Sequence, residues 1–145
     1  MRSQEKDGDS DLTKYNKCMK DDFIEKAKNK YKYIQSPVRC NCLNRNIIFN
    51  SDGFMHLLRN GQGSPRPLKE IQHKTRLIPL IIPVLRNATD ASYEKRMVKK
   101  NRKKNAPIVV AEYWGISAKV GKSDIAVRVI VRRIGSGEAH FWSVM

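Results

Sequence analysis

The stretch PIVVAEYWGISAKVGKSDIAVRVIVRRIGSGEAHFWSVM, residues 107–145, decides the fold class. It is rich in Ile, Val, Tyr and Trp, and turn-forming residues divide it at 121–124 and 135–137. Within it, Ile125–Ile134 alternates valines with basic residues, which is the pattern of a strand with one buried face. The stretch therefore predicts an antiparallel meander with strands in 107–120, 125–134 and 139–144.

Helical patterns precede this stretch. Apolar residues in 15–34 recur every three or four positions, and a second helical period in 68–85 is interrupted by Pro79 and Pro83, which predicts a kink or two consecutive helices. We therefore expect an α+β fold, with N-terminal helices packed on a C-terminal antiparallel meander of three to four strands. The expected organisation is a disordered acidic leader (1–12), then one domain (13–145) that is helical in 15–90 and has its sheet in 107–145.

The charge of the chain indicates its partner. The 145 residues contain 29 Lys and Arg against 14 Asp and Glu, a formal net charge of +15. The densest block, 94–104, has seven bases and one acid. A polyanion is the natural counterion of such a chain, and solubility alone needs much less charge. No segment joins a basic face to a continuous apolar one, so we expect nucleic acid rather than a membrane.

The expected cellular location follows from the search for targeting segments and from the number of cysteines. No apolar run is long enough to span a membrane, and the polar N-terminus does not resemble a signal peptide. The three cysteines are an odd number, which favours reduced thiols. Cys40 and Cys42 are too close in sequence for the usual paired zinc ligands. We therefore expect a cytoplasmic protein with no metal and no cofactor.

The chain has three histidines, each with a structural alternative. His56 lies in a short helix predicted over 53–59, where Ser51 or Asp52 is a suitable N-cap. It is either a packed helix residue or an acid–base group, since its ordinary pKa lies near neutrality. His140 is either a substrate-binding residue or a surface residue at the end of a hairpin, and His73 is most simply a solvated helix residue.

Several basic residues are candidates for phosphate binding. Arg128 and Arg132 are four apart on a predicted strand and share the face opposite the valines. The alternative is that they pair with acids on neighbouring strands. Lys69 and Arg76, seven apart on a basic helix, form either one wall of an anionic-substrate cleft or a solvated helix face.

The register of the last hairpin decides where Ser143 points. A two-residue turn pairs Ile130 with Ser143 and Arg132 with Phe141; it places Ser143 on the basic face and buries Trp142 in the core. A three-residue loop puts Ser143 on the valine face instead. We favour the first register because it buries Trp142.

The stretch 46–145 resembles the phage and mobile-element branch of the barnase–EndoU–colicin–RelE-like nucleases. The similarity lies in Ile47-Ile48-Phe49, in Asp52-Gly53-Phe54-Met55-His56-Leu57-Leu58, in Arg128–Gly135 and in His140–Val144. The resemblance implies helices followed by a four-stranded meander and metal-independent ribonuclease activity, often as a toxin. It also implies catalytic roles for His56, Arg76 and Ser143.

The expected function is therefore cleavage of RNA by attack of the 2′-hydroxyl, which leaves a 2′,3′-cyclic phosphate. His56, Arg76 and Ser143 are the catalytic candidates, and Lys69, Arg128, Arg132 and His140 the substrate-binding ones. Expected partners are RNA (tRNA, mRNA or rRNA) and, for a toxin, a small acidic antitoxin or immunity protein. Two alternatives stay open: a non-enzymatic basic module that binds RNA or DNA, and an assembly protein of a mobile element.

Overall fold

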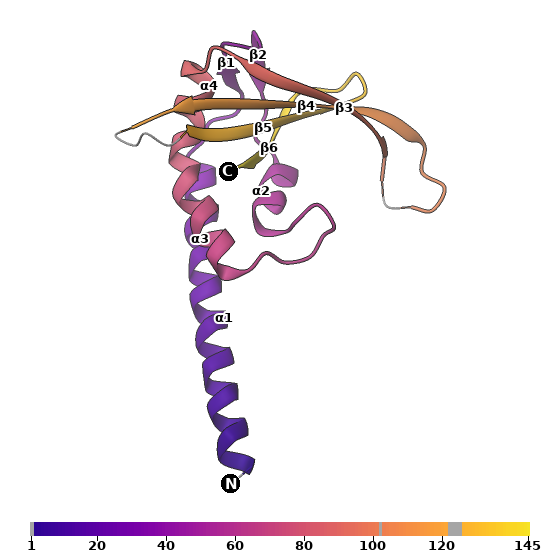
Figure 1. Ribbon diagram of the computed structural model, residues 1–145. Helices are drawn as coiled ribbons and strands as arrows, with labels where there is room; N and C mark the ends of the chain where they lie inside the picture. Colours follow the sequence, from indigo (N-terminus) through magenta and orange to yellow (C-terminus); the bar gives the residue numbers. More distant parts are fainter. Residues whose placement is uncertain (1, 102, 122–125) are drawn as a thin grey trace.

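The helices come first along the chain and the main sheet last (Figure 1). The computed structural model describes residues 2–101, 103–121 and 126–145. The helices are α1 (Arg2–Lys32), α2 (Ser51–Leu58), α3 (Leu68–Leu77), the short 3₁₀ helix η1 (Ile78–Leu80) and α4 (Ile81–Asn87). The strands are β1 (Val38–Cys40), β2 (Arg45–Ile47), β3 (Ala91–Lys99), β4 (Ile108–Lys119), β5 (Ala126–Ile134) and β6 (His140–Val144). The predicted α+β class is confirmed.

The main sheet is an antiparallel meander with the strand order β3-β4-β5-β6, and β1 and β2 form a separate small hairpin. The sheet begins earlier than predicted, because β3 precedes residue 107. As an edge strand, β3 is exposed along nearly its whole length, so its sequence lacks the alternation of a half-buried strand. Of the turn predicted at 121–124, residues 122–124 lie outside the described part of the chain.

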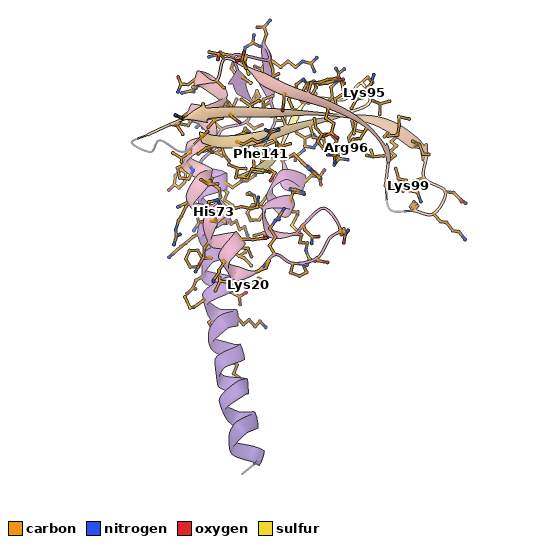
Figure 2. The ribbon with its side chains drawn as sticks, viewed as in Figure 1. Lys20, His73, Lys95, Arg96, Lys99 and Phe141 are labelled. Carbon is orange, nitrogen blue, oxygen red and sulfur yellow. The ribbon has the colours of Figure 1, made fainter. Side chains whose placement is uncertain are left out.

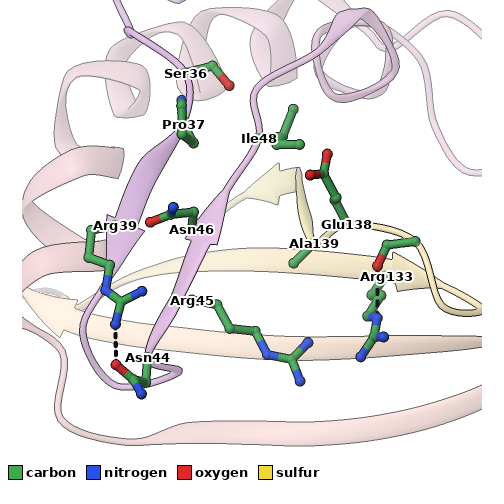
Figure 3. A pocket seen from close by; sticks show the side chains of 11 residues that line it. Ser36, Pro37, Arg39, Asn44, Arg45, Asn46, Ile48, Arg133, Glu138 and Ala139 are labelled. Atoms are coloured by element: carbon green, nitrogen blue, oxygen red, sulfur yellow. Dashed lines mark hydrogen bonds between the residues drawn. The ribbon is translucent and has the colours of Figure 1, made fainter.

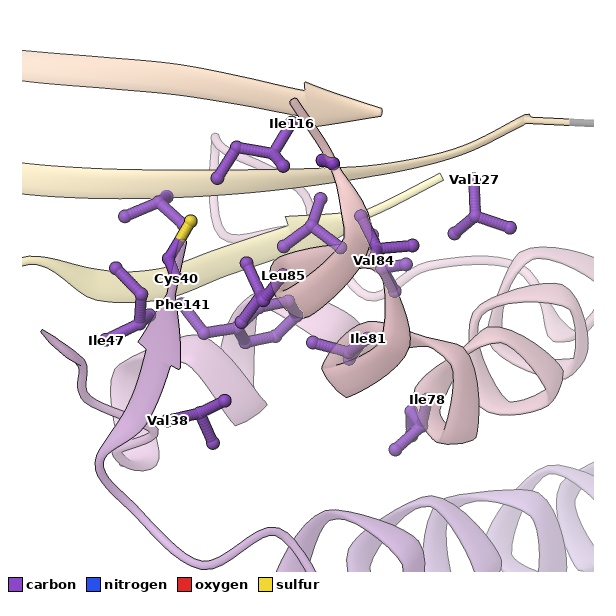
Figure 4. Packing of buried hydrophobic residues seen from close by; sticks show 14 of the residues in the cluster. Val38, Cys40, Ile47, Ile78, Ile81, Val84, Leu85, Ile116, Val127 and Phe141 are labelled. Carbon is purple, nitrogen blue, oxygen red and sulfur yellow. The ribbon is translucent and has the colours of Figure 1, made fainter. Parts of the chain in front are cut away.

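The core lies on the valine face of the sheet. Val127, Val129 and Val131 of β5 are all buried, as the alternation predicted. Ile81 and Leu85 of α4 pack against this face, and the β1–β2 hairpin closes the same cluster (Figure 4). The opposite face, which carries Arg128 and Arg132, is therefore left open.

The predicted long helix is divided into three pieces around Pro79, and Pro83 lies in the first turn of α4. Helix α3 ends at Leu77, Pro79 lies in the short helix η1 that follows, and α4 begins directly after η1. A proline removes one backbone donor and its ring crowds the preceding turn, so a single straight helix is disfavoured. The prediction of a kink or consecutive helices is confirmed.

Helix α1 differs from the expectation at its start. It begins at Arg2, so residues 2–12, which we expected to form a disordered leader, continue the helix. This segment contains no proline to stop a helix, and Gly8 is its only glycine. The N-terminal part of α1 extends away from the rest of the protein (Figure 1). None of the described helices is long and apolar enough to cross a membrane.

Helix α2 is fixed against β6 by close contacts. Its N-cap is Asn50, whose side chain accepts a hydrogen bond from Gly53 N at 3.1 Å, rather than Ser51 or Asp52. Tyr31 of α1 donates to the carbonyl of Asn50 at 2.7 Å. A Cβ at Gly53 would lie 2.5 Å from the carbonyl oxygen of Phe141, so only glycine permits this approach. These contacts hold the first turn of α2 beside β6.

A bulge in the last hairpin sets which way Trp142 points. Ile130 pairs with Ser143, as predicted, but Val131 pairs with Phe141, so Trp142 is the extra residue. Phe141 is fully buried and fills the core position expected for Trp142. The predicted pairing of Arg132 with Phe141 and the burial of Trp142 in the core are wrong. The bulge turns Trp142 toward the open face.

Candidate functional site

Two adjoining clefts lie on the open face of the sheet, between its strands and the α2–α3 region. The inner cleft, of about 870 Å³, is lined from all four strands and from both helices, by His56, Arg66, Lys74, Ser92, Tyr93, Glu94, Arg96, Tyr113, Gly115, Arg128, Ile130, Trp142, Ser143 and Met145. The outer cleft, of about 1030 Å³, lies toward the β3–β4 hairpin and the loop after α2, and its lining includes Asp52, Arg59, Asn60, Lys99, Lys100, Asn101 and Arg132. Basic and aromatic side chains outnumber acidic ones in both.

His56 lies where the two clefts meet. Its ring stacks on Trp142 with the centroids 4.1 Å apart, and Arg66 Nε donates to the His56 carbonyl at 3.1 Å. Burial first, and then the charges of Arg66 and Lys74, lower the pKa of His56 to about 4. The ring is therefore neutral at neutral pH. Its Nδ1 is buried and has no hydrogen-bond partner among the described residues.

Lys74 and Ser143 form a buried pair at the floor of the inner cleft. Lys74 Nζ donates to Ser143 Oγ at 3.2 Å and to the Val144 carbonyl at 2.8 Å. The two residues are 8% and 3% exposed. Burial, and next the positive charge of Arg66, lower the pKa of Lys74 to about 8. Lys74 is therefore a cation that gives up its proton more readily than an exposed lysine.

Arg128 is held across the sheet by its neighbours. Its Nη2 donates to Ser92 Oγ at 2.9 Å, which draws the guanidinium over Gly115. A Cβ at position 115 would lie 2.1 Å from that Nη2, so the glycine makes room for the arginine. The side chain remains exposed, and the guanidinium lines the inner cleft where an anionic group can reach it.

Planar side chains form a continuous row between the clefts, which we call the planar row. Beyond His56 and Trp142, the Arg132 guanidinium lies 4.2 Å from the Trp142 ring centroid and 5.7 Å from that of Tyr113. Arg96 covers the same Tyr113 ring at 5.0 Å. Arg96 also forms two hydrogen bonds of 2.9 Å with Glu94, which neutralise part of its charge. From Trp142 onward the row therefore alternates aromatic rings and guanidinium groups.

The structure brings together only some of the residues that the sequence singled out. His56, Ser143 and Arg128 line the inner cleft, and Arg132 lines the outer one. Arg76 does not join them, because it is two residues beyond Lys74 and so about 200° around α3, on the exposed side. Lys69 is exposed in the same way.

His140 also lies outside the two clefts. It is half-buried, pairs with Arg132 in the sheet, and meets the edge of the Trp142 ring at a centroid distance of 6.0 Å. Burial, and next the charge of Arg132, lower its pKa. Its contact with Trp142 is therefore a packing contact outside both clefts.

Sequence reasoning missed several residues of the site. Lys74 was missed because its charge and its place in the last turn of α3 do not distinguish it from Arg76. The available signal was the apolar side of the helix, since Lys74 shares that side with the buried residues Ile71 and Thr75. Arg96 escaped because β3 was not recognised as a strand, and its place beside Tyr113 depends on the sheet register.

A third cleft, of about 730 Å³, lies between the β1–β2 hairpin and the β5–β6 turn (Figure 3). Its guanidinium groups are already engaged. Arg39 donates to the Asn44 side chain, and Arg133 Nε donates to the Gly137 carbonyl at 2.9 Å. Arg45 packs over Trp114 at 5.0 Å. None of the residues described around this cleft is a histidine, so the His56 clefts are the better candidate for chemistry.

The cysteines do not form a ligand set in the described part of the chain. Cys40 Sγ lies 3.7 Å from Cys42 Sγ, while Cys18 is exposed on α1. Burial raises the pKa of Cys40 to about 11, which disfavours its thiolate. No three His, Cys, Asp or Glu side chains gather among the described residues into a possible metal site.

Comparison with known proteins adds no further identification. Neither protein-family models, nor curated proteins, nor solved structures match this chain. The site is therefore interpreted from its own chemistry.

Proposed function

We propose that this protein is a ribonuclease that cleaves RNA without a metal ion. The observation that carries the proposal is the position of His56, a neutral imidazole in a basic cleft that also holds the buried Lys74–Ser143 pair. The sequence resemblance supports the same activity through His56 and Ser143. Lys74 takes the place that the sequence assigned to Arg76.

His56 acts as the general base in this proposal. A neutral imidazole accepts the proton of the ribose 2′-hydroxyl, and the oxygen then attacks the adjacent phosphorus. The P–O5′ bond breaks as the new P–O2′ bond forms. The products are a 2′,3′-cyclic phosphate and a chain with a free 5′-hydroxyl.

Lys74 acts as the general acid. The leaving 5′-oxygen needs a proton, and an ammonium with a pKa of about 8 donates it more readily than an ordinary lysine. Ser143, which accepts a hydrogen bond from Lys74, positions the phosphate or ribose through its hydroxyl group. One base and one acid with separated pKa values then share a single cleft.

The arginines stabilise the phosphorane. Negative charge grows on the non-bridging oxygens during attack, and fixed cations in a partly dehydrated cleft offset it. Arg128 is an exposed guanidinium at the inner cleft, and Arg66 lies beside His56. Arg132 packs on the Trp142 ring and lines the outer cleft, so it is not assigned to the reacting phosphate.

Incubation of the purified protein with total RNA in EDTA tests the activity. We expect discrete fragments whose 3′-ends are cyclic phosphates, which resist a phosphatase until acid opens them. Fragments that appear only after Mg²⁺ is restored, or that carry 5′-phosphates, would contradict the proposed chemistry.

The pH dependence of kcat/KM follows from the two shifted groups. Activity requires neutral His56 and protonated Lys74, so the rate should rise as pH passes about 4 and fall as pH passes about 8. Unperturbed groups would place both limbs more than two pH units higher. Lys74→Arg should remove the alkaline limb, because a guanidinium keeps its proton. An unchanged alkaline limb in an active K74R protein would exclude Lys74 as the acid.

A non-enzymatic RNA- or DNA-binding module is the alternative. The stacking of His56 on Trp142 and the burial of its Nδ1 also suit a structural ring, and the basic β3–β4 hairpin suits backbone binding. This function predicts tight binding in EDTA with intact RNA. A small acidic antitoxin or immunity protein, and a cytoplasmic location, belong with the ribonuclease proposal.

A further inference from the structure

The outer cleft is not needed for the reaction described above, yet it adjoins the reacting groups directly. Four residues line both clefts, namely His56, Arg96, Tyr113 and Trp142. The bond-cleaving site is thus at a junction rather than at the end of a closed pocket. A ligand held only by the inner cleft would leave this second, larger space unused.

The wall between the clefts offers stacking planes to unpaired bases at its two ends, because Trp142 and Tyr113 are each covered by two neighbours in the row while His56 and Arg96 have only one. The planar row runs from His56 through Trp142, Arg132 and Tyr113 to Arg96. The distance between the ring centroids of the first pair is 4.1 Å, and the distances from arginine Cζ to ring centroid in the next three pairs are 4.2, 5.7 and 5.0 Å. Bases of a single strand stack on aromatic rings and guanidinium planes, and each stacked base contributes about 1–3 kcal/mol. In a duplex those base faces are already covered by their neighbours.

The rim of the outer cleft suits the phosphate backbone. Lys99 and Lys100 at the end of β3 are exposed, and Arg59 faces them from the loop after α2. Figure 2 shows Arg96 and Lys99 in sequence along β3 toward the hairpin. Asp52 is the only acid among the described lining residues. The rim therefore offers cations to a chain whose bases turn inward.

We propose that the outer cleft binds the nucleotides that flank the cleaved bond, so that the ligand is a single RNA strand crossing the planar row between the two clefts. The proposal rests on the proposed function for the nature of the ligand, and it concerns binding rather than the chemical step. It assigns Lys99 and Lys100 to the backbone of the flanking nucleotides.

The test measures binding to 2′-O-methyl RNA, which lacks the attacking hydroxyl and so cannot be cleaved. Fluorescence anisotropy compares a single-stranded octamer, the same octamer as a blunt duplex, and a dinucleotide. We expect the single strand to bind at least tenfold more tightly than the duplex. The double variant Lys99→Ala/Lys100→Ala should weaken binding of the octamer roughly tenfold. Because it removes two phosphate contacts, it should also lower the magnitude of the slope of log K against log salt by about 1.4. Binding of the dinucleotide should stay unchanged.

The matched control is Lys103→Ala/Lys104→Ala, which removes the same charge from the same hairpin at two exposed positions outside both clefts. It should leave octamer affinity within about twofold of the wild type. Equal losses in both double variants, or a duplex that binds as tightly as the single strand, would overturn the proposal. Because no arm depends on cleavage, an inactive protein that meets these expectations would contradict only the ribonuclease function.

Discussion

The His56→Ala protein is expected to cleave RNA about 10²–10⁴-fold more slowly than the wild type, which is the usual contribution of a positioned general base. Its affinity for uncleavable 2′-O-methyl RNA should fall far less than its rate, because the substitution removes one neutral ring of the planar row from a cleft that keeps its cations. The measurement is a single-turnover rate in EDTA beside an anisotropy titration. A loss of rate that is much larger than the loss of affinity separates chemistry from binding.

His73→Ala is the control for this change. His73 is an exposed histidine on α3 and lies outside both clefts (Figure 2). The same substitution there should leave the rate at the wild-type value. Circular dichroism should show both variants folded, since His56 also packs on Trp142. Full activity of a folded His56→Ala protein would remove His56 from the mechanism and favour the binding-module function.

Affinity for single-stranded RNA should fall about 10²–10³-fold between 50 and 200 mM salt. The two clefts together present Arg59, Arg66, Lys74, Arg96, Lys99, Lys100, Arg128 and Arg132. Arg96 is paired with Glu94, Arg66 is paired with Glu70, and Lys74 is buried against Ser143, so about five cations remain for phosphates. Each contact with a single strand lowers the slope of log K against log salt by about 0.7.

A neutral-backbone oligonucleotide of the same sequence separates charge from stacking. It should retain the contacts with the planar row and show almost no salt dependence. A flat salt response with ordinary RNA would contradict the phosphate-binding role of both clefts, whatever the enzyme does. A slope of log K against log salt that corresponds to only one or two phosphate contacts would indicate that the ligand occupies the inner cleft alone.

Local periodicity was enough to predict the architecture. The alternation in β5 required one apolar and one basic face, because successive side chains of a strand point to opposite sides. That rule alone placed Arg128 and Arg132 together and Val129 in the core. Pro79 likewise stops a helix through its own covalent structure. Such features depend on neighbours in sequence, so they can be derived without coordinates.

The placement of the catalytic candidates depended on tertiary contacts. His56 could be assigned to a short helix, but its contact with Trp142 requires a bulge in β6 and the close approach of Gly53 to Phe141. Neither of these has a signal within a single segment. Phe141 occupies the core position because the bulge shifts the alternation by one residue, which no single-strand pattern reveals.

The choice between Lys74 and Arg76 shows the same limit most clearly. Both are basic residues in the last turn of α3, and the sequence treats them as equivalent. The packing of α3 turns Lys74 toward Ser143, 69 residues away, and leaves Arg76 in solvent. The sequence by itself determined the α+β class, the strands of the meander from β4 onward and the basic face of the sheet. Tertiary structure alone decided which cations meet His56, because that depends on how separate elements rotate against one another when their apolar surfaces are buried.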